Sequence, residues 1–259
     1  MRKNKVKIKQ IRMDFSVTPE VQRYVYMYLI LGQRCYLIDG GVAGAADVVE
    51  QCLQQHGRRI EELDGLFLTH AHPDHMGGAA EIQAQSGCMV YASEGEKPWI
   101  EDTGLQFRNR PIPNFHQLTG GPVQVNRTLA DGEVLQPEPG LTLRVEETPG
   151  HSRGDLSYLL EEERCIFTGD AIPVPDDIPI WVSGRDSAES LRHLETLCLS
   201  GAVETVYPAW DLAYYGTDEI LDKIRAAEDL VERLSRWACH PLFQRTVEGM
   251  REESAGKHV

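Results

Sequence analysis

The chain has 259 residues, of which 41% are hydrophobic, and a formal net charge of −14 at pH 7. This length is sufficient for a large core, and we expect one α/β domain over residues 1–259. The negative charge argues against a nucleic-acid partner or an anionic membrane, because both require clustered Lys and Arg. The sequence contains no recognisable targeting peptide and no run of about 20 apolar residues, so we expect a cytoplasmic protein.

The spacing of apolar residues predicts an alternation of strands and helices along the chain. The predicted strands cover residues 6–13, 23–31, 34–38, 66–69, 88–92, 141–148, 156–160, 165–168 and 205–207. The predicted helices cover residues 45–56, 186–199 and about 217–237. Prolines and glycines interrupt residues 94–121, which we expect to form a long loop or cap. Since strands precede a helix in both halves, two β-sheets packed face to face with helices outside are expected.

The most informative segment is LTHAHPDHMGG at residues 68–78. It places three histidines and an aspartate directly after a predicted strand, where the next helix begins. Residues i and i+2 of an extended chain face the same side, so His70 and His72 can share one cation. Beyond the turn, Asp74 and His75 can reach a second cation. A single histidine would indicate only a surface residue, but four ligand-type residues in this order predict a metal site.

The H-x-H-x-D-H pattern of this segment resembles that of the metallo-β-lactamase superfamily of hydrolases. TPGHS at residues 148–152 and FTGD at residues 167–170 resemble two further superfamily motifs in the same order. The resemblance implies a four-layer αβ/βα sandwich of two mixed β-sheets with helices on the outer faces. The β-lactamases proper use a thiol near the position of Asp170, whereas the carboxylate resembles glyoxalase II and related thioesterases, lactonases and phosphodiesterases.

The same resemblance implies a binuclear site and a mechanism. The implied ligands are His70, His72 and His151 for the first metal, Asp74 and His75 for the second, and Asp170 as a bridge. Two divalent ions are expected, zinc first, with iron or manganese as alternatives. Asp74 would also orient a metal-bound hydroxide, which attacks an ester, thioester or lactone in a small-molecule substrate. Neither the substrate nor the oligomeric state is indicated.

The chain departs from the superfamily pattern at its last ligand. Where a histidine usually stands, the sequence reads Tyr207-Pro208-Ala209-Trp210-Asp211. We hypothesise that the carboxylate of Asp211 replaces the lost imidazole. The alternative is that Asp211 caps the following turn and the second metal is weak or absent. Two other functions stay open: a single-iron oxygenase of sulfur compounds, and a non-catalytic protein that keeps the metal site.

Three further expectations concern the loops and the cysteines. Trp99 and Phe107 could form an apolar wall of the substrate pocket. Prolines in residues 172–184 indicate a rigid loop whose Asp176, Asp177 and Trp181 could line an entrance. The six cysteines form no C-x-x-C pair and are expected to be buried free thiols.

Overall fold

The computed structural model describes residues 6–175 and 182–238, so Asp176, Asp177 and Trp181 lie outside the described residues. The strands are β1 (Lys7–Thr18), β2 (Val21–Leu31), β3 (Cys35–Ile38), β4 (Leu63–Phe67), β5 (Met89–Ser93), β6 (Arg127–Leu129), β7 (Val134–Glu138), β8 (Leu141–Glu147), β9 (Leu156–Leu160), β10 (Cys165–Gly169), β11 (Thr205–Pro208) and β12 (Tyr214–Tyr215). The helices are α1 (Ala45–Gln55), α2 (Pro73–Met76), α3 (Ala79–Ser86), α4 (Lys97–Glu101), α5 (Thr103–Asn109), α6 (Phe115–Leu118), α7 (Gly184–Leu199) and α8 (Thr217–Ala238). None of the helices in this part of the chain combines the length and the apolarity that crossing a bilayer requires.

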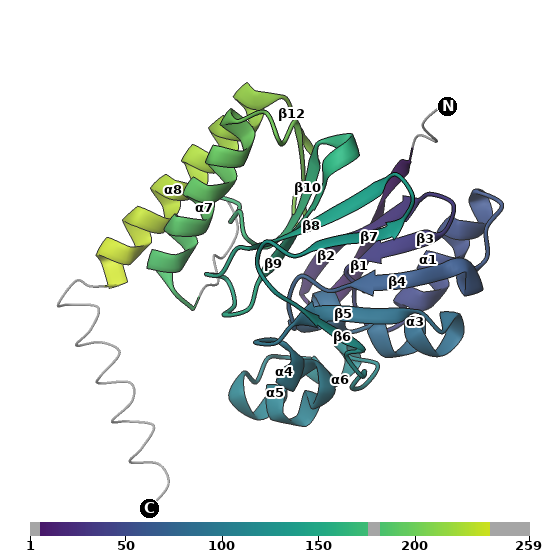
Figure 1. Cartoon of the computed structure of the whole chain (residues 1–259). Coiled ribbons are helices and arrows are strands. Elements are labelled where there is room, and N and C mark those ends of the chain that lie inside the picture. The colour runs from purple at the N-terminus through teal and green to yellow at the C-terminus, as the bar shows by residue number, and fades with distance from the viewer. Residues whose placement is uncertain (1–5, 176–181, 239–259) are drawn as a thin grey trace, which may run out of the picture.

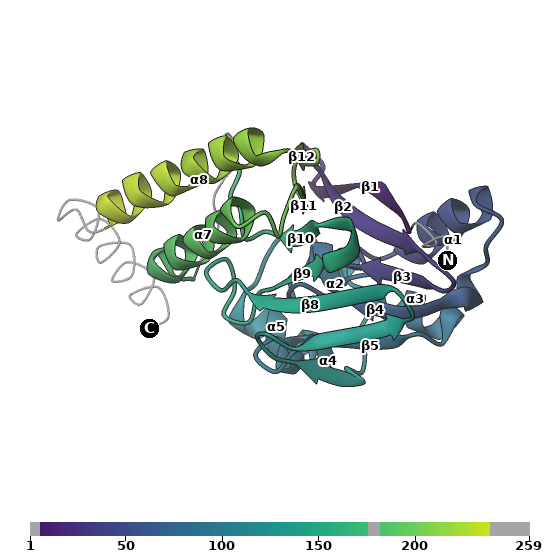
Figure 2. The ribbon, with the colours of Figure 1, turned by 45° about the horizontal axis from the view of Figure 1, so that its top comes forward.

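Two mixed six-stranded sheets form the centre of the molecule (Figure 1). The first has the order β1-β2-β3-β4-β5-β6, antiparallel up to β3 and parallel from β3 to β6. The second has the order β12-β11-β10-β9-β8-β7, with one parallel pair, β10 and β11. Helices α1 and α3 pack against the first sheet, and α7 and α8 lie side by side against the second (Figure 2). The predicted four-layer sandwich is confirmed.

Strand β2 shows why these residues form an internal layer. Its side chains alternate between two faces, and both faces are apolar, as expected for a strand that is covered on each side. Met27 and Leu29 belong to the cluster that packs under α1, whereas Tyr28 belongs to the cluster between the sheets. There its ring centroid lies 5.4 Å from that of Phe167 on β10. Aromatic packing therefore joins the two sheets directly behind the strand ends that carry the site.

The residues predicted to bind metal follow the carboxyl ends of strands from both sheets. His70 comes after β4, His151 after β8 and Asp170 directly after β10. Gly169 allows the two sheets to approach closely here, since its φ is +50° and a Cβ would lie 2.6 Å from Oγ1 of Thr69. Loops at the carboxyl ends of strands are where α/β folds commonly build ligand sites.

The segment predicted as a long loop is helical instead, which corrects the expectation for residues 94–121. Helices α4, α5 and α6 have five, seven and four residues, too few for a 3.6-residue period to appear in the sequence. Pro98 lies in the first turn of α4, where proline is compatible with a helix. The short strands β6, β7 and β12 were not predicted either.

Candidate metal centre

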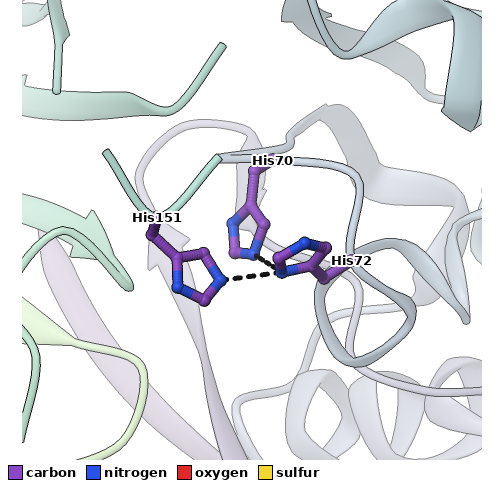
Figure 3. Close-up of side chains that lie close together, drawn as sticks. All are labelled: His70, His72 and His151. Atoms are coloured by element: carbon purple, nitrogen blue, oxygen red, sulfur yellow. Dashed lines mark hydrogen bonds between the residues drawn. The ribbon is translucent and has the colours of Figure 1, made fainter. Parts of the chain in front are cut away.

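Three histidines converge from the two halves of the chain (Figure 3). Nδ1 of His72 lies 3.0 Å from Nε2 of His70 and 2.7 Å from Nε2 of His151. His70 and His72 are buried, and the side chain of His151 is 11% exposed. The three ring nitrogens therefore face a common point at the end of the sandwich, as expected for three ligands of one ion.

A second group of ligand-type atoms adjoins the first. His75 Nε2 lies 3.1 Å from Oδ1 of Asp170, and the other oxygen of Asp170 lies 3.1 Å from Nε2 of His151. His70, His75 and Asp170 lie close enough together to share a cation. Asp74 stands beside this group, with Oδ2 3.6 Å from His75 Nε2. The carboxylate of Asp170 thus faces both groups, one oxygen to each.

The chemistry of these atoms fits divalent metals. Within the described residues, Nε2 of His75 and Oδ1 of Asp170 are buried and have few polar partners, chiefly the contact of 3.1 Å between them. Buried polar atoms with few partners are costly, and a cation bound between them would satisfy both. Three imidazoles in the first group suit zinc, whereas a group with more carboxylate oxygens also accommodates iron or manganese.

Residues behind the histidines orient their rings. Nδ1 of His75 lies 2.9 Å from Oδ2 of Asp39, and Oγ1 of Thr69 lies 3.0 Å from Nδ1 of His70. The amide of Thr69 in turn donates to Oδ1 of Asp39 at 2.8 Å. Hydrogen bonds at Nδ1 leave Nε2 of both rings available to a metal. Asp39 was not predicted from the sequence, although a carboxylate directly after an apolar strand was the available signal.

The pKa shifts differ between the two groups of the cluster. The pKa values of His70 and His72 are lowered, chiefly by burial. Burial acts in the same direction on His75, but Asp170, Asp39 and Asp74 outweigh it and raise its pKa well above the usual value. For Asp170, burial would raise the pKa, yet His75 and His151 outweigh this effect and lower it. His70 and His72 are therefore neutral beside the ionised Asp170, and these are the forms that coordinate metals. A metal at His75, in contrast, would have to displace its proton.

The structure does not bring Asp211 to this cluster. Its Oδ2 lies 2.7 Å from Nζ of Lys223 on α8 and accepts a hydrogen bond from the hydroxyl of Tyr214 at 3.1 Å. Oδ1 accepts the amide hydrogen of Leu212 at 2.8 Å. The carboxylate is satisfied by these three partners, so the hypothesis that Asp211 replaces the missing histidine is withdrawn.

Trp210, the preceding residue, interacts with the site in a different way. A hydrogen bond from its side chain contributes to the lowered pKa of Asp170. Its ring packs against Phe15 and Tyr24, with centroids 6.3 and 6.2 Å apart, and the guanidinium of Arg23 lies over it at 4.4 Å. Because indole is a donor and not a ligand, Trp210 orients Asp170 where the superfamily pattern has a histidine.

Glu96 joins the two histidine-bearing loops to the short helices. One of its oxygens accepts the amide of Ala71, between His70 and His72, at 2.9 Å. The other accepts the hydroxyl of Ser152 at 2.6 Å and the amide of Gly154 at 2.9 Å, both next to His151. These are three hydrogen bonds to one buried carboxylate. The role of Glu96 was not predicted, because nothing in the local sequence distinguishes it from a surface glutamate.

Removal of this carboxylate is expected to destabilise the fold. For Glu96→Ala we expect the free energy of unfolding to fall by about 3 kcal/mol, since buried donors lose their charged acceptor. Glu94→Ala is the matched control, because Glu94 is exposed, and it should change stability by less than about 0.5 kcal/mol. Urea unfolding of the metal-free proteins measures both values. Equal stabilities would show that the three hydrogen bonds contribute nothing.

Asp155 adds a second buried carboxyl to the same loop. Its Oδ1 lies 2.8 Å from the hydroxyl of Ser152, which also donates to Glu96. Burial raises the pKa of Asp155 to about 7. One hydroxyl hydrogen cannot serve two carboxylates at once, so a protonated Asp155 that donates to Ser152 satisfies the arrangement.

A cavity of about 720 Å³ opens beside the histidines. Its lining includes His72 and His151, and Trp99 and Leu105 contribute apolar surface. Trp99 is thus in the position predicted for a pocket wall. Phe107 does not line this cavity but packs against Phe115, with ring centroids 5.2 Å apart. The volume is typical of a small-molecule site.

Comparison with known proteins identifies the family of this architecture. The model of the metallo-beta-lactamase superfamily matches residues 21–227. The chain belongs to this superfamily. The resemblance carried by the three sequence motifs is therefore confirmed. The histidine-rich groups described above are consistent with membership of this superfamily.

Individual relatives of the superfamily match parts of the chain. A hydroxyacylglutathione hydrolase of Rhodopseudomonas palustris (strain BisA53) is 32% identical over 110 residues, which cover 42% of this chain and 34% of that protein. A probable metallo-hydrolase, YqgX, of Bacillus subtilis (strain 168) is 30% identical over 145 residues, 56% of this chain and 64% of that protein. A metallo-beta-lactamase family protein from Thermus thermophilus superimposes with a TM-score of 0.67 at 21% identity, covering 89% of this chain and 79% of the other, which shows the shared fold.

Proposed function

We propose that the protein is a binuclear metal-dependent hydrolase of thioesters or related esters and lactones. His70, His72 and His151 are the proposed ligands of the first metal, and Asp74 and His75 those of the second, with Asp170 between them. The observation that carries this proposal is the carboxylate of Asp170, whose two oxygens each lie 3.1 Å from a histidine of a different group. When bound, such metals act as Lewis acids and lower the pKa of water from about 15.7 toward about 7.

In this proposal, side chains of the protein position the substrate and accept a hydrogen bond from the attacking water. Asp74 lies at the edge of the second group, 3.6 Å from His75, with its side chain 19% exposed. We propose that this carboxylate accepts a hydrogen bond from the attacking water and so orients it toward the substrate. The substrate would lie in the adjoining cavity, where Trp99 and Leu105 exclude water from the acyl group.

Thioesters are the first substrates to test. Two relatives are named a hydroxyacylglutathione hydrolase and an atrochrysone carboxyl ACP thioesterase, the latter from Aspergillus fumigatus at 29% identity over 181 residues. These matches cover only 34% and 36% of the length of the two relatives. That this chain acts on similar substrates is therefore a proposal.

A hydrolysis panel with chelation tests the proposed function. Metal-replete protein is offered a thioester, an ester, a lactone and a phosphodiester, before and after removal of metal. We expect turnover of the thioester, its loss on chelation, and recovery after zinc is restored. Absence of turnover on every member of the panel, or turnover that persists in fully chelated protein, would contradict the proposal.

One observation favours a second candidate, the single-iron oxygenase. His70, His75 and Asp170 form a two-histidine, one-carboxylate set, which is typical of non-haem iron sites that use dioxygen. Oxygen consumption with a persulfide by protein that contains one iron per chain would favour this function. The three-histidine group is the reason that we place hydrolysis first.

A further inference from the structure

Arg110 presents a partly buried cation to the cavity and makes no direct ion pair among the described residues. It lies at the carboxyl end of α5 and is one of the residues that line the cavity. Across residues 6–175 and 182–238, its guanidinium makes no hydrogen bond, ion pair or cation–π contact. Acidic side chains are present nearby, but neither Asp74 nor Asp170 forms an ion pair with it. A partly desolvated guanidinium that no carboxylate pairs with directly is unfavourable, so the site is suited to bind an anion.

The helix that ends at Arg110 is hydrogen-bonded to the metal loop. Four residues earlier on α5, the side-chain amide of Gln106 donates a hydrogen bond to the carbonyl of Ala71, between His70 and His72. Gln106 is buried, and the amide of Arg110 donates to its carbonyl at 2.8 Å. Arg110 itself follows the last helical turn, with φ −144° and ψ 74°, and lines the cavity together with His72 and His151. Its charge therefore lies in the same cavity as two of the proposed metal ligands.

A second guanidinium lines the same cavity from the other half of the chain. Arg153 follows His151 by two residues and likewise has no hydrogen bond or ion pair within the described parts of the chain. The remaining wall is largely apolar, with Trp99, Leu105 and Val182. The cavity of about 720 Å³ thus carries two cations in a chain whose net charge is −14. They would attract a small anion selectively.

We propose that Arg110, assisted by Arg153, recognises an anionic group, a carboxylate or a phosphate, on the substrate. The inference rests on the proposed function, because it assigns the substrate class of that same site. The substrate would combine three parts: a reacting carbonyl near the histidines, an apolar body against Trp99 and Leu105, and an anion at the guanidinium groups. Bidentate hydrogen bonding makes arginine well suited to either anion.

Paired thioesters test the proposal by kinetics. One acyl chain ends in a carboxylate, one in a phosphate, and one in a neutral carboxamide of similar size. We expect Arg110→Gln to raise KM for the preferred anionic thioester about ten- to hundredfold while KM for the carboxamide changes less than about twofold. Arg108→Gln is the matched control, because Arg108 is exposed, lies on the same helix and pairs with Asp102 at 3.7 Å. Whichever of the carboxylate and phosphate thioesters has the lower KM identifies the anionic group that is recognised.

Equilibrium binding separates failure of this inference from failure of the proposed function. Calorimetry of the metal-loaded protein measures 3-phenylpropanoate, phenyl phosphate and the neutral 3-phenylpropanamide, with no turnover required. Weaker binding of an anion by Arg110→Gln but not by Arg108→Gln supports the inference even if no thioester is hydrolysed. Equal binding of all three probes by the parent and Arg110→Gln overturns the inference, even if hydrolysis is found.

Discussion

Replacement of His151 by alanine is expected to remove most of the hydrolytic activity together with the first metal. Nε2 of His151 lies 2.7 Å from Nδ1 of His72, which lies 3.0 Å from Nε2 of His70, and His151 follows a strand of the other sheet. Loss of several kcal/mol of metal assistance corresponds to a fall in kcat/KM of about 10³-fold or more. Elemental analysis and thioester kinetics on the same preparation measure both effects.

His56→Ala is the control for this variant. His56 is exposed just beyond α1 and belongs to neither group of proposed ligands. The control should keep the metal content and activity of the parent. Thermal unfolding of both variants checks that they fold. A His151→Ala protein that retains the full metal content and rate would remove the three-histidine site from the mechanism.

Asp170→Asn is expected to cause the loss of one of the two metals. The amide keeps the shape of the side chain but loses the charge that faces His75 and His151. We expect the variant to retain close to one metal per chain and to lose about 10²- to 10³-fold in kcat, because a neutral amide is a poor bridge between two cations. Metal titration followed by mass spectrometry of the native protein counts the ions.

Asp211→Asn tests whether Asp211 contributes to metal binding, as proposed for Asp170. Since Asp211 is paired with Lys223 and Tyr214, this substitution should leave metal content and kcat within about twofold of the parent. Loss of the second metal in Asp211→Asn, with Asp170→Asn unaffected, would reverse the assignment of the two aspartates.

The parts of the site that the sequence predicted are those encoded next to buried strands. His70, His72 and His75 follow β4 within a few residues, and the side-chain alternation of a strand already places His70 and His72 on one side. Asp170 directly follows β10 in the same way. The layered fold was predictable for the same reason, because strands covered on both faces have long apolar stretches.

The parts that the sequence did not predict depend on contacts between distant segments. Glu96 and Gln106 both bind the backbone of Ala71, and no local pattern encodes a hydrogen bond to a main-chain atom of another loop. Asp211 was predicted to bind metal because it stands one residue after the position of the missing histidine. Its carboxylate instead pairs with Lys223 on α8. Neighbourhood in the chain does not determine the direction of a side chain when a helix packs beside it.

An anomalous difference map from crystals of the zinc-loaded protein tests most directly whether these loops form a metal centre. We expect one peak within about 2.0–2.1 Å of ring nitrogens of His70, His72 and His151, and a second between His75 and Asp170. Peaks located only elsewhere on the molecule, with the three rings unliganded, would contradict the proposed centre and the hydrolysis that depends on it.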